Sequence, residues 1–148
     1  MSIHELVDAV DRETESIDEL LSYITQQREA VVNKDLKTIQ DLMKLLHSSS
    51  LEVYKCESLR DKAATSVAAE LGCEKKLRDI CEAMGDEGEE LRLSGEKLIK
   101  AVKSIGAESK ILKRLVEEGQ KFNDMMLSEM RRFEGADSFG VSSMDVKG

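Results

Sequence analysis

The class of this fold is decided by residues 3–32, IHELVDAVDRETESIDELLSYITQQREAVV. Nine positions taken at alternating steps of three and four residues hold seven apolar side chains, and this spacing places them on one face of a helix. Ser2 is a suitable N-cap, and Glu5 three residues later completes a capping box. The stretch therefore predicts one amphipathic helix over residues 3–32.

The same spacing predicts a second long helix over residues 35–71. Asp35 can cap its start, and Leu71-Gly72 provides a stop signal, because glycine readily adopts the left-handed conformation that follows many helices. Seven of its nine seam positions fit the pattern, and these positions are 39, 42, 46, 49, 53, 56, 60, 63 and 67.

Two further helices follow, a short one over residues 74–84 and a long one over 87–134. Gly85 and Gly88 lie between them and predict a turn. Nine of the thirteen seam positions in the last helix are apolar, and these positions are 91, 95, 98, 102, 105, 109, 112, 116, 119, 123, 126, 130 and 133.

Together these elements predict an all-α fold. At a rise of 1.5 Å per residue the three long helices measure roughly 45, 55 and 70 Å. We expect an elongated antiparallel three-helix bundle or coiled coil, with the short extra helix between the second and last long helices. The last helix is long enough to extend beyond the other two. Residues 1–134 form this bundle, and residues 135–148, rich in Gly, Ser, Ala and Asp, are expected to be a flexible tail.

Charge and hydropathy exclude several classes of partner. The net charge of −8 disfavours nucleic acid, because phosphate binding needs a local excess of cations. No uncharged run approaches the length of a membrane span, and the first residues lack the features of a signal peptide. Three cysteines at uneven spacing are expected to be reduced, as in the cytosol. We therefore expect a cytoplasmic protein without membrane insertion.

Catalytic and metal motifs are not found. Cys56, Cys73 and Cys81 lie seventeen and eight residues apart, and neither His4 nor His47 has an acidic residue three positions before it, as a di-iron bundle requires. No serine lies in a Gly-x-Ser-x-Gly turn. A phosphoryl-accepting His47 is the one enzymatic alternative. We expect no enzyme, no catalytic residue, no bound metal and no cofactor.

Two surfaces of the last helix each admit two interpretations. Lys100, Lys103, Lys110 and Arg114 approximate a basic stripe, which is either a solvated outer face or a surface for an acidic partner. Residues 120–133, QKFNDMMLSEMRRF, hold two of the three Phe and three of the seven Met. Methionine-rich surfaces adapt to partner helices, so this stretch is either an exposed binding stripe or ordinary core.

With these residues laid out, the chain resembles the FlgN-type flagellar export chaperones over nearly its whole length. The order and spacing of five short motifs carry the resemblance: Gln27-Arg28-Glu29-Ala30, Lys34-Asp35-Leu36, Leu71-Gly72, Asn123 and Phe139-Gly140. The chain differs from the family pattern at Gln120, where a second Asn is common, and at Phe139, where Tyr is common.

The resemblance implies a cytoplasmic chaperone of the flagellar type III export system. Such a protein binds hook–filament junction (hook-associated) proteins, prevents their premature assembly and delivers them to the export gate. The expected contact region is the last helix and the tail, and the implied partner-binding residues are Phe122, Asn123, Met126, Met130, Phe133, Phe139 and Gly140. The alternative is a structural or adaptor coiled coil that self-associates as a homo-oligomer through its helix seams.

Overall fold

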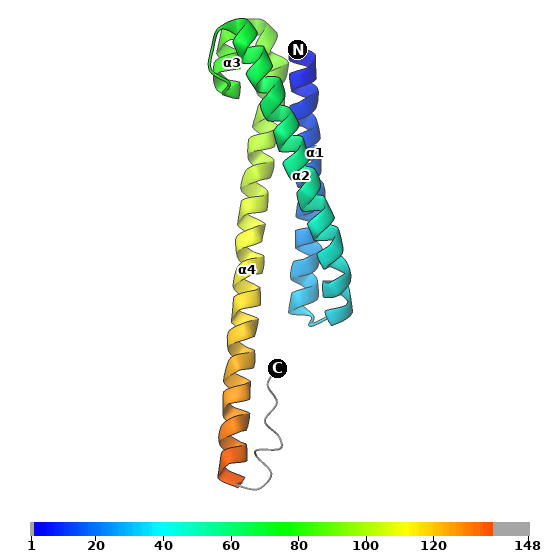
Figure 1. The fold of residues 1–148 in the computed structure, drawn as a ribbon, viewed down its shortest axis with the longest axis vertical. Helices are drawn as coiled ribbons and strands as arrows, with labels where there is room; N and C mark the ends of the chain where they lie inside the picture. Colours follow the sequence, from blue (N-terminus) through cyan, green and yellow to red (C-terminus); the bar gives the residue numbers. More distant parts are fainter. Residues whose placement is uncertain (1, 138–148) are drawn as a thin grey trace. The chain divides into compact units, whose positions relative to one another are not determined.

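The computed structural model describes the backbone of residues 2–137, and their side chains except at positions 122, 123, 126, 129, 130 and 133–137. In chain order the elements are α1 (Ile3–Val32), α2 (Leu36–Leu71), α3 (Leu77–Met84), the 3-10 helix η1 (Gly85–Gly88) and α4 (Glu89–Asp137) (Figure 1). No strand occurs among the described residues, and the predicted all-α class is confirmed. The chain divides into two compact units, residues 1–112 and 113–148.

Local capping chemistry sets the boundaries of α1 and α2. The Ser2 hydroxyl accepts a hydrogen bond from the Glu5 backbone N–H at 3.2 Å. After Val32 the chain turns, and the Asp35 carboxylate accepts from the Thr38 N–H at 3.2 Å, so that α2 begins at Leu36. These caps satisfy backbone donors that have no partner within the first turn. The short turn sends α2 back along α1 as an antiparallel hairpin (Figure 1).

The seam of α2 lies where the sequence predicted it. All nine positions are buried or half-buried, namely Ile39, Leu42, Leu46, Ser49, Val53, Cys56, Arg60, Ala63 and Val67. Near its C-terminal end, α2 contributes four small side chains to the core: Ala63, Ala64, Val67 and Ala68. Small side chains let helices approach closely, and here they meet Leu6 and Val10 of α1, Ile80 of α3, and Leu91 and Leu98 of α4 within one core cluster.

The seam of α4 departs from the prediction within the first unit. Val102 was expected on the buried face, yet it is 50% exposed, whereas its neighbour Ala101 is only 6% exposed. The prediction placed the second buried position of each heptad four residues after the first, whereas the residues three positions after the first, Ser94, Ala101 and Glu108, are the buried or half-buried ones. The buried line therefore passes from Leu98 to Ala101 and then to half-buried Ile105 and Glu108.

The connection between α2 and α4 differs from the prediction, because α3 is shorter and α4 begins at Glu89 rather than at residue 87. Gly72, with a φ of 70°, ends α2, and α3 begins at Leu77 rather than at residue 74. The predicted turn at residues 85–88 is the 3-10 helix η1, which packs on α3. At Gly88 an added Cβ would lie 2.8 Å from the carbonyl oxygen of Cys81, so this contact requires a residue without a side chain.

Hydrogen bonds and ion pairs between polar side chains also link the helices of the first unit. The Arg60 Nε of α2 donates to the Glu13 carboxylate of α1, which is nearly fully buried. The buried Gln27 side chain donates to the Ile39 carbonyl oxygen at 3.1 Å. Arg28 of α1 forms an ion pair with Glu108 of α4 at 3.5 Å. Buried polar groups need such partners, and the partners in turn fix how the helices align.

Candidate functional site

The predicted partner-binding residues fall in the second unit or beyond the described residues. Phe122, Asn123, Met126, Met130 and Phe133 belong to α4, and their positions share one side of its helical backbone. Their side chains lie outside the described residues. Phe139 and Gly140 also lie outside the described residues. The partner-binding set therefore stays a prediction.

The described side chains of the same stretch of α4 are exposed. Val116, Met125 and Leu127 are 41%, 56% and 48% exposed. Val116 and Leu127 are eleven residues apart, which is close to three full turns, so they lie on the same side of the helix. Met125 lies on a nearly opposite side. Apolar surface in this stretch is thus not confined to one stripe.

Met125 and Leu127 were not among the predicted binding residues. They were not selected because they do not fall on the three-and-four spacing of the main seam. Exposed Met and Leu side chains supply adaptable apolar contact area, and here they do so on two sides of the helix. Around them lie exposed charges of both signs, including Lys121, Asp124 and Arg131. The segment therefore offers apolar contact area with a mixed polar border.

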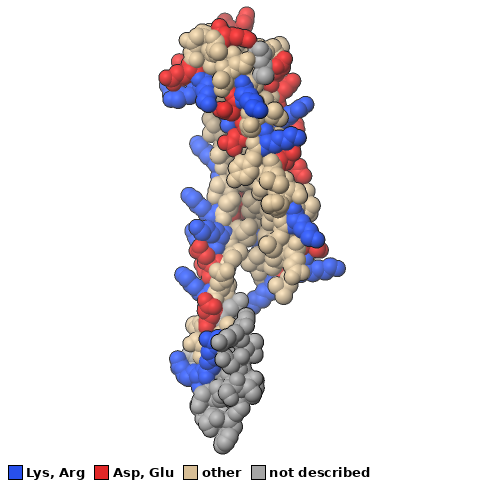
Figure 2. Space-filling view, in the orientation of Figure 1, with Lys and Arg blue, Asp and Glu red and all other residues tan. Residues whose placement is uncertain are grey.

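The basic residues of α4 in the first unit lie on its solvent side. Lys100, Lys103 and Lys110 are all exposed, in agreement with the interpretation of a solvated outer face. Lys and Arg side chains follow the edge formed by α4 in Figure 2. Both interpretations of the stripe, a solvated outer face and a surface for an acidic partner, need lysines that are exposed in this way.

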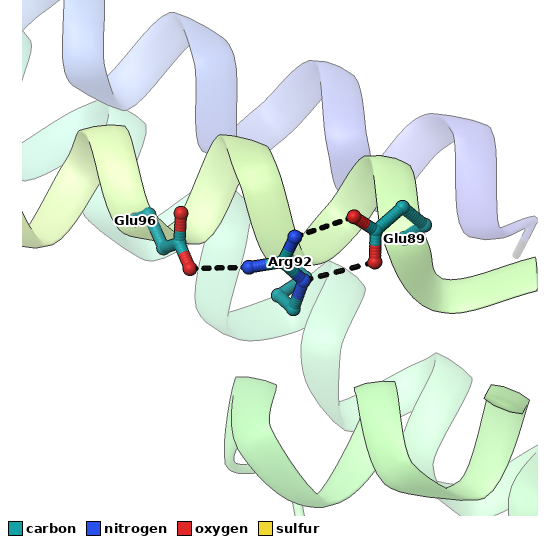
Figure 3. Close-up of polar contacts among 3 residues, drawn as sticks. All are labelled: Glu89, Arg92 and Glu96. Atoms are coloured by element: carbon teal, nitrogen blue, oxygen red, sulfur yellow. Dashed lines mark hydrogen bonds and ion pairs between the residues drawn. The ribbon is translucent and has the colours of Figure 1, made fainter. Parts of the chain in front are cut away.

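The first turns of α4 are held by a charge network on the surface. The Arg92 guanidinium binds the Glu89 carboxylate with two nitrogens and reaches Glu96 on its other side (Figure 3). The hydrogen bonds from Arg92 lower the pKa of Glu89, and both carboxylates raise the pKa of Arg92. Glu89 also suits the positive end of the helix dipole. The network stabilises the start of the helix and gives no indication of a catalytic role.

The cysteines and histidines are not gathered into a site. Among the described residues no group of three or more His, Cys, Asp or Glu side chains could hold a metal ion. Cys56 is buried and hydrogen-bonds Glu52 at 3.7 Å, and burial raises the pKa of the Cys81 thiol. His47 is exposed on α2. An open groove of about 270 Å³ between α1 and α2 is lined mainly by surface residues such as Asp8 and Arg12.

Within residues 2–137, none of the helices is long and apolar enough to cross a membrane. Comparison with curated proteins and with solved structures finds no match. A family model described as FlgN protein matches residues 1–138. Because this match covers nearly all of the 148 residues, the chain belongs to the FlgN family, a family of flagellar export chaperones without enzymatic activity.

Proposed function

We propose that this protein is a cytoplasmic chaperone of the flagellar type III export system whose clients are hook–filament junction proteins. The family match over residues 1–138 carries the proposal. It is supported by the exposed apolar side chains of Val116, Met125 and Leu127 on α4, in the stretch that also holds the predicted partner-binding residues. Surface of this kind binds amphipathic helices.

The proposed mechanism needs only helix pairing. A junction protein that assembles through terminal amphipathic helices exposes their apolar faces before assembly. The stretch of α4 around Phe122, Met126 and Met130 covers such a face and so prevents premature association. Release at the export gate follows from competition for the same helices, and no nucleotide is consumed.

The proposal is tested by co-expressing the full chain with the terminal helical segments of the junction proteins from its source organism. Native mass spectrometry then reports the complex. Met126→Asp and Met130→Asp are expected to remove it, because a carboxylate cannot be buried unpaired in an apolar contact without a cost of several kcal/mol. Ile99→Asp is the control, since it places a carboxylate at another exposed apolar position of α4 that lies outside this stretch.

Three outcomes separate the alternatives. Loss of the complex in Met126→Asp and Met130→Asp, with retention in Ile99→Asp, supports the chaperone and its proposed surface. A complex that survives all three substitutions means that another surface binds the client. No complex with any junction segment, together with a stable homo-oligomer, replaces the chaperone by a self-associating coiled coil.

A further inference from the structure

The outward side of α2 carries a repeated pattern that the hairpin core does not use. Three times an exposed apolar residue is directly followed by a lysine: Leu36-Lys37, Met43-Lys44 and Tyr54-Lys55. The three apolar side chains are 72%, 59% and 68% exposed. Steps of seven and eleven residues each return to within about 20° of the starting direction on a helix, so all three pairs face the same way.

The strip between these apolar residues is free of charge. Gln40, His47 and Ser50 lie along it, and Leu51, which is 55% exposed, widens it. Tyr54 lies eighteen residues after Leu36, so the strip is about 27 Å long at 1.5 Å per residue. This length matches an ordinary partner helix of about five turns. We refer to Leu36, Met43, Leu51 and Tyr54 with their three lysines as the α2 outer face.

The lysines of this face have no acidic partner within the described part of the chain. Neither Lys37, Lys44 nor Lys55 forms an ion pair there, whereas Arg60 and Lys75 of the same region do. Asp41 and Glu52 border the lysine row on the side away from the apolar strip, three or four residues from the lysines, and in the described structure they form no ion pair with them. A row of unpaired cations beside an apolar strip is complementary to a helix whose apolar seam is bordered by carboxylates.

We propose that the α2 outer face is a docking surface for an amphipathic helix of a partner protein that carries Asp or Glu along one border of its apolar seam. A second copy of this chain fits less well. An antiparallel copy of α2 would place one lysine row against the other, and like charges in register oppose pairing. The apolar strip supplies contact area, and the lysine row selects the partner by charge.

This surface is made only of residues from the first unit and does not rest on the proposed function. The predicted client residues of α4 take no part in it. Its lysines and apolar residues are exposed, so their substitution leaves the core cluster unchanged. Each substituted protein therefore keeps its fold, which circular dichroism checks.

The test uses the full chain and two synthetic helical peptides of about 20 residues, enough to cover the strip. Both have a leucine seam; one carries Glu along a border of the seam, and the other carries Lys at the same positions. Fluorescence anisotropy measures binding. The glutamate peptide is expected to bind at least about tenfold more tightly than the lysine peptide, since three exposed ion pairs replace three repulsions.

Charge reversal locates the effect. The triple variant Lys37→Glu/Lys44→Glu/Lys55→Glu is expected to reverse the preference between the peptides. The matched control changes the same net charge on α4, with Lys100, Lys103 and Lys110 each replaced by Glu, and is expected to keep it. Equal binding of both peptides, or equal loss of preference in the control, would overturn the proposal. So would a homodimer of the unmodified chain that Met43→Asp dissociates, because a second copy would then occupy the face.

Discussion

The ion pair between Glu13 of α1 and Arg60 of α2 holds the α1–α2 hairpin in register, and its removal tests this role. Glu13 is 4% exposed, and the Arg60 side chain covers its carboxylate while remaining 24% exposed itself. Replacing Arg60 by Met keeps most of the apolar length of the side chain but removes the donor. The carboxylate is then buried without a partner. This substitution isolates the electrostatic contribution from the packing contribution.

The expected cost follows from the burial of the two groups. Removing one member of a buried ion pair costs about 3–5 kcal/mol, because the other charge stays away from water. Arg60 is partly exposed, so water can reach part of the vacated space, which places Arg60→Met near the lower end, at about 3 kcal/mol. For a chain of this size that corresponds to a decrease in Tm of roughly 10 °C.

The assay is urea unfolding followed by circular dichroism at 222 nm, with a double variant as control. Glu13→Leu/Arg60→Met removes both charges and is expected to restore most of the lost stability, since replacing a buried pair by apolar residues is often neutral or stabilising. A cost below about 1 kcal/mol for Arg60→Met would refute the reasoning. A double variant no more stable than Arg60→Met alone would refute it equally, because Glu13 would then not be an uncompensated charge.

Three smaller predictions concern caps, glycines and a thiol. Gly88→Ala is expected to lower the free energy of unfolding by about 1–3 kcal/mol, because the added Cβ would meet the Cys81 carbonyl oxygen. Gly106→Ala places its Cβ in open space and is expected to raise the free energy of unfolding by up to about 1 kcal/mol in the same urea titration. Hydrogen bonds from Thr38 lower the pKa of Asp35; the cap therefore stabilises α2 above the ordinary pKa of about 4, and the stability difference between the unmodified chain and Asp35→Ala should vanish as the pH falls through the lowered value. Burial raises the pKa of Cys81, so iodoacetamide at pH 8 should modify it more slowly in the native protein than in urea, as read by peptide mass spectrometry.

The sequence predicted the hairpin well because its signals are local. Ser2 and Asp35 each cap a helix through contacts three residues away, and Gly72 ends α2 by its own backbone preference. The buried face of α2 follows from spacing alone. Glu13 could not be placed in the core in this way, because its burial depends on Arg60, which lies 47 residues further along the chain.

The candidate sites were predicted less completely, for two physical reasons. A search for three- and four-residue spacing detects the longest apolar line of a helix. It therefore detected the core-facing line of α2 and missed the second apolar strip, which includes Met43 and Tyr54. Three- and four-residue steps can also be taken in either order, and Ala101 and Val102 are neighbouring apolar choices, which explains why Val102 was assigned to the buried face of α4. The same choice of step order affects any assignment further along α4, and Met125 and Leu127 show that exposed apolar side chains occur off the predicted line.

Salt dependence separates the two proposed surfaces. The α2 outer face selects its partner through a row of lysines without acidic partners in the described chain, so binding of the glutamate peptide should weaken steadily between low salt and about 1 M salt, where the Debye length falls to about 3 Å. The stretch of α4 that holds Met125 and Leu127 has exposed charges of both signs around apolar side chains, so binding of a client helix there should change little. Client binding that falls with salt as steeply as peptide binding would mean that lysine contacts, and not apolar burial, hold the client. The chaperone function would then be assigned to the α2 outer face, and the Met126→Asp and Met130→Asp variants would bind the client normally.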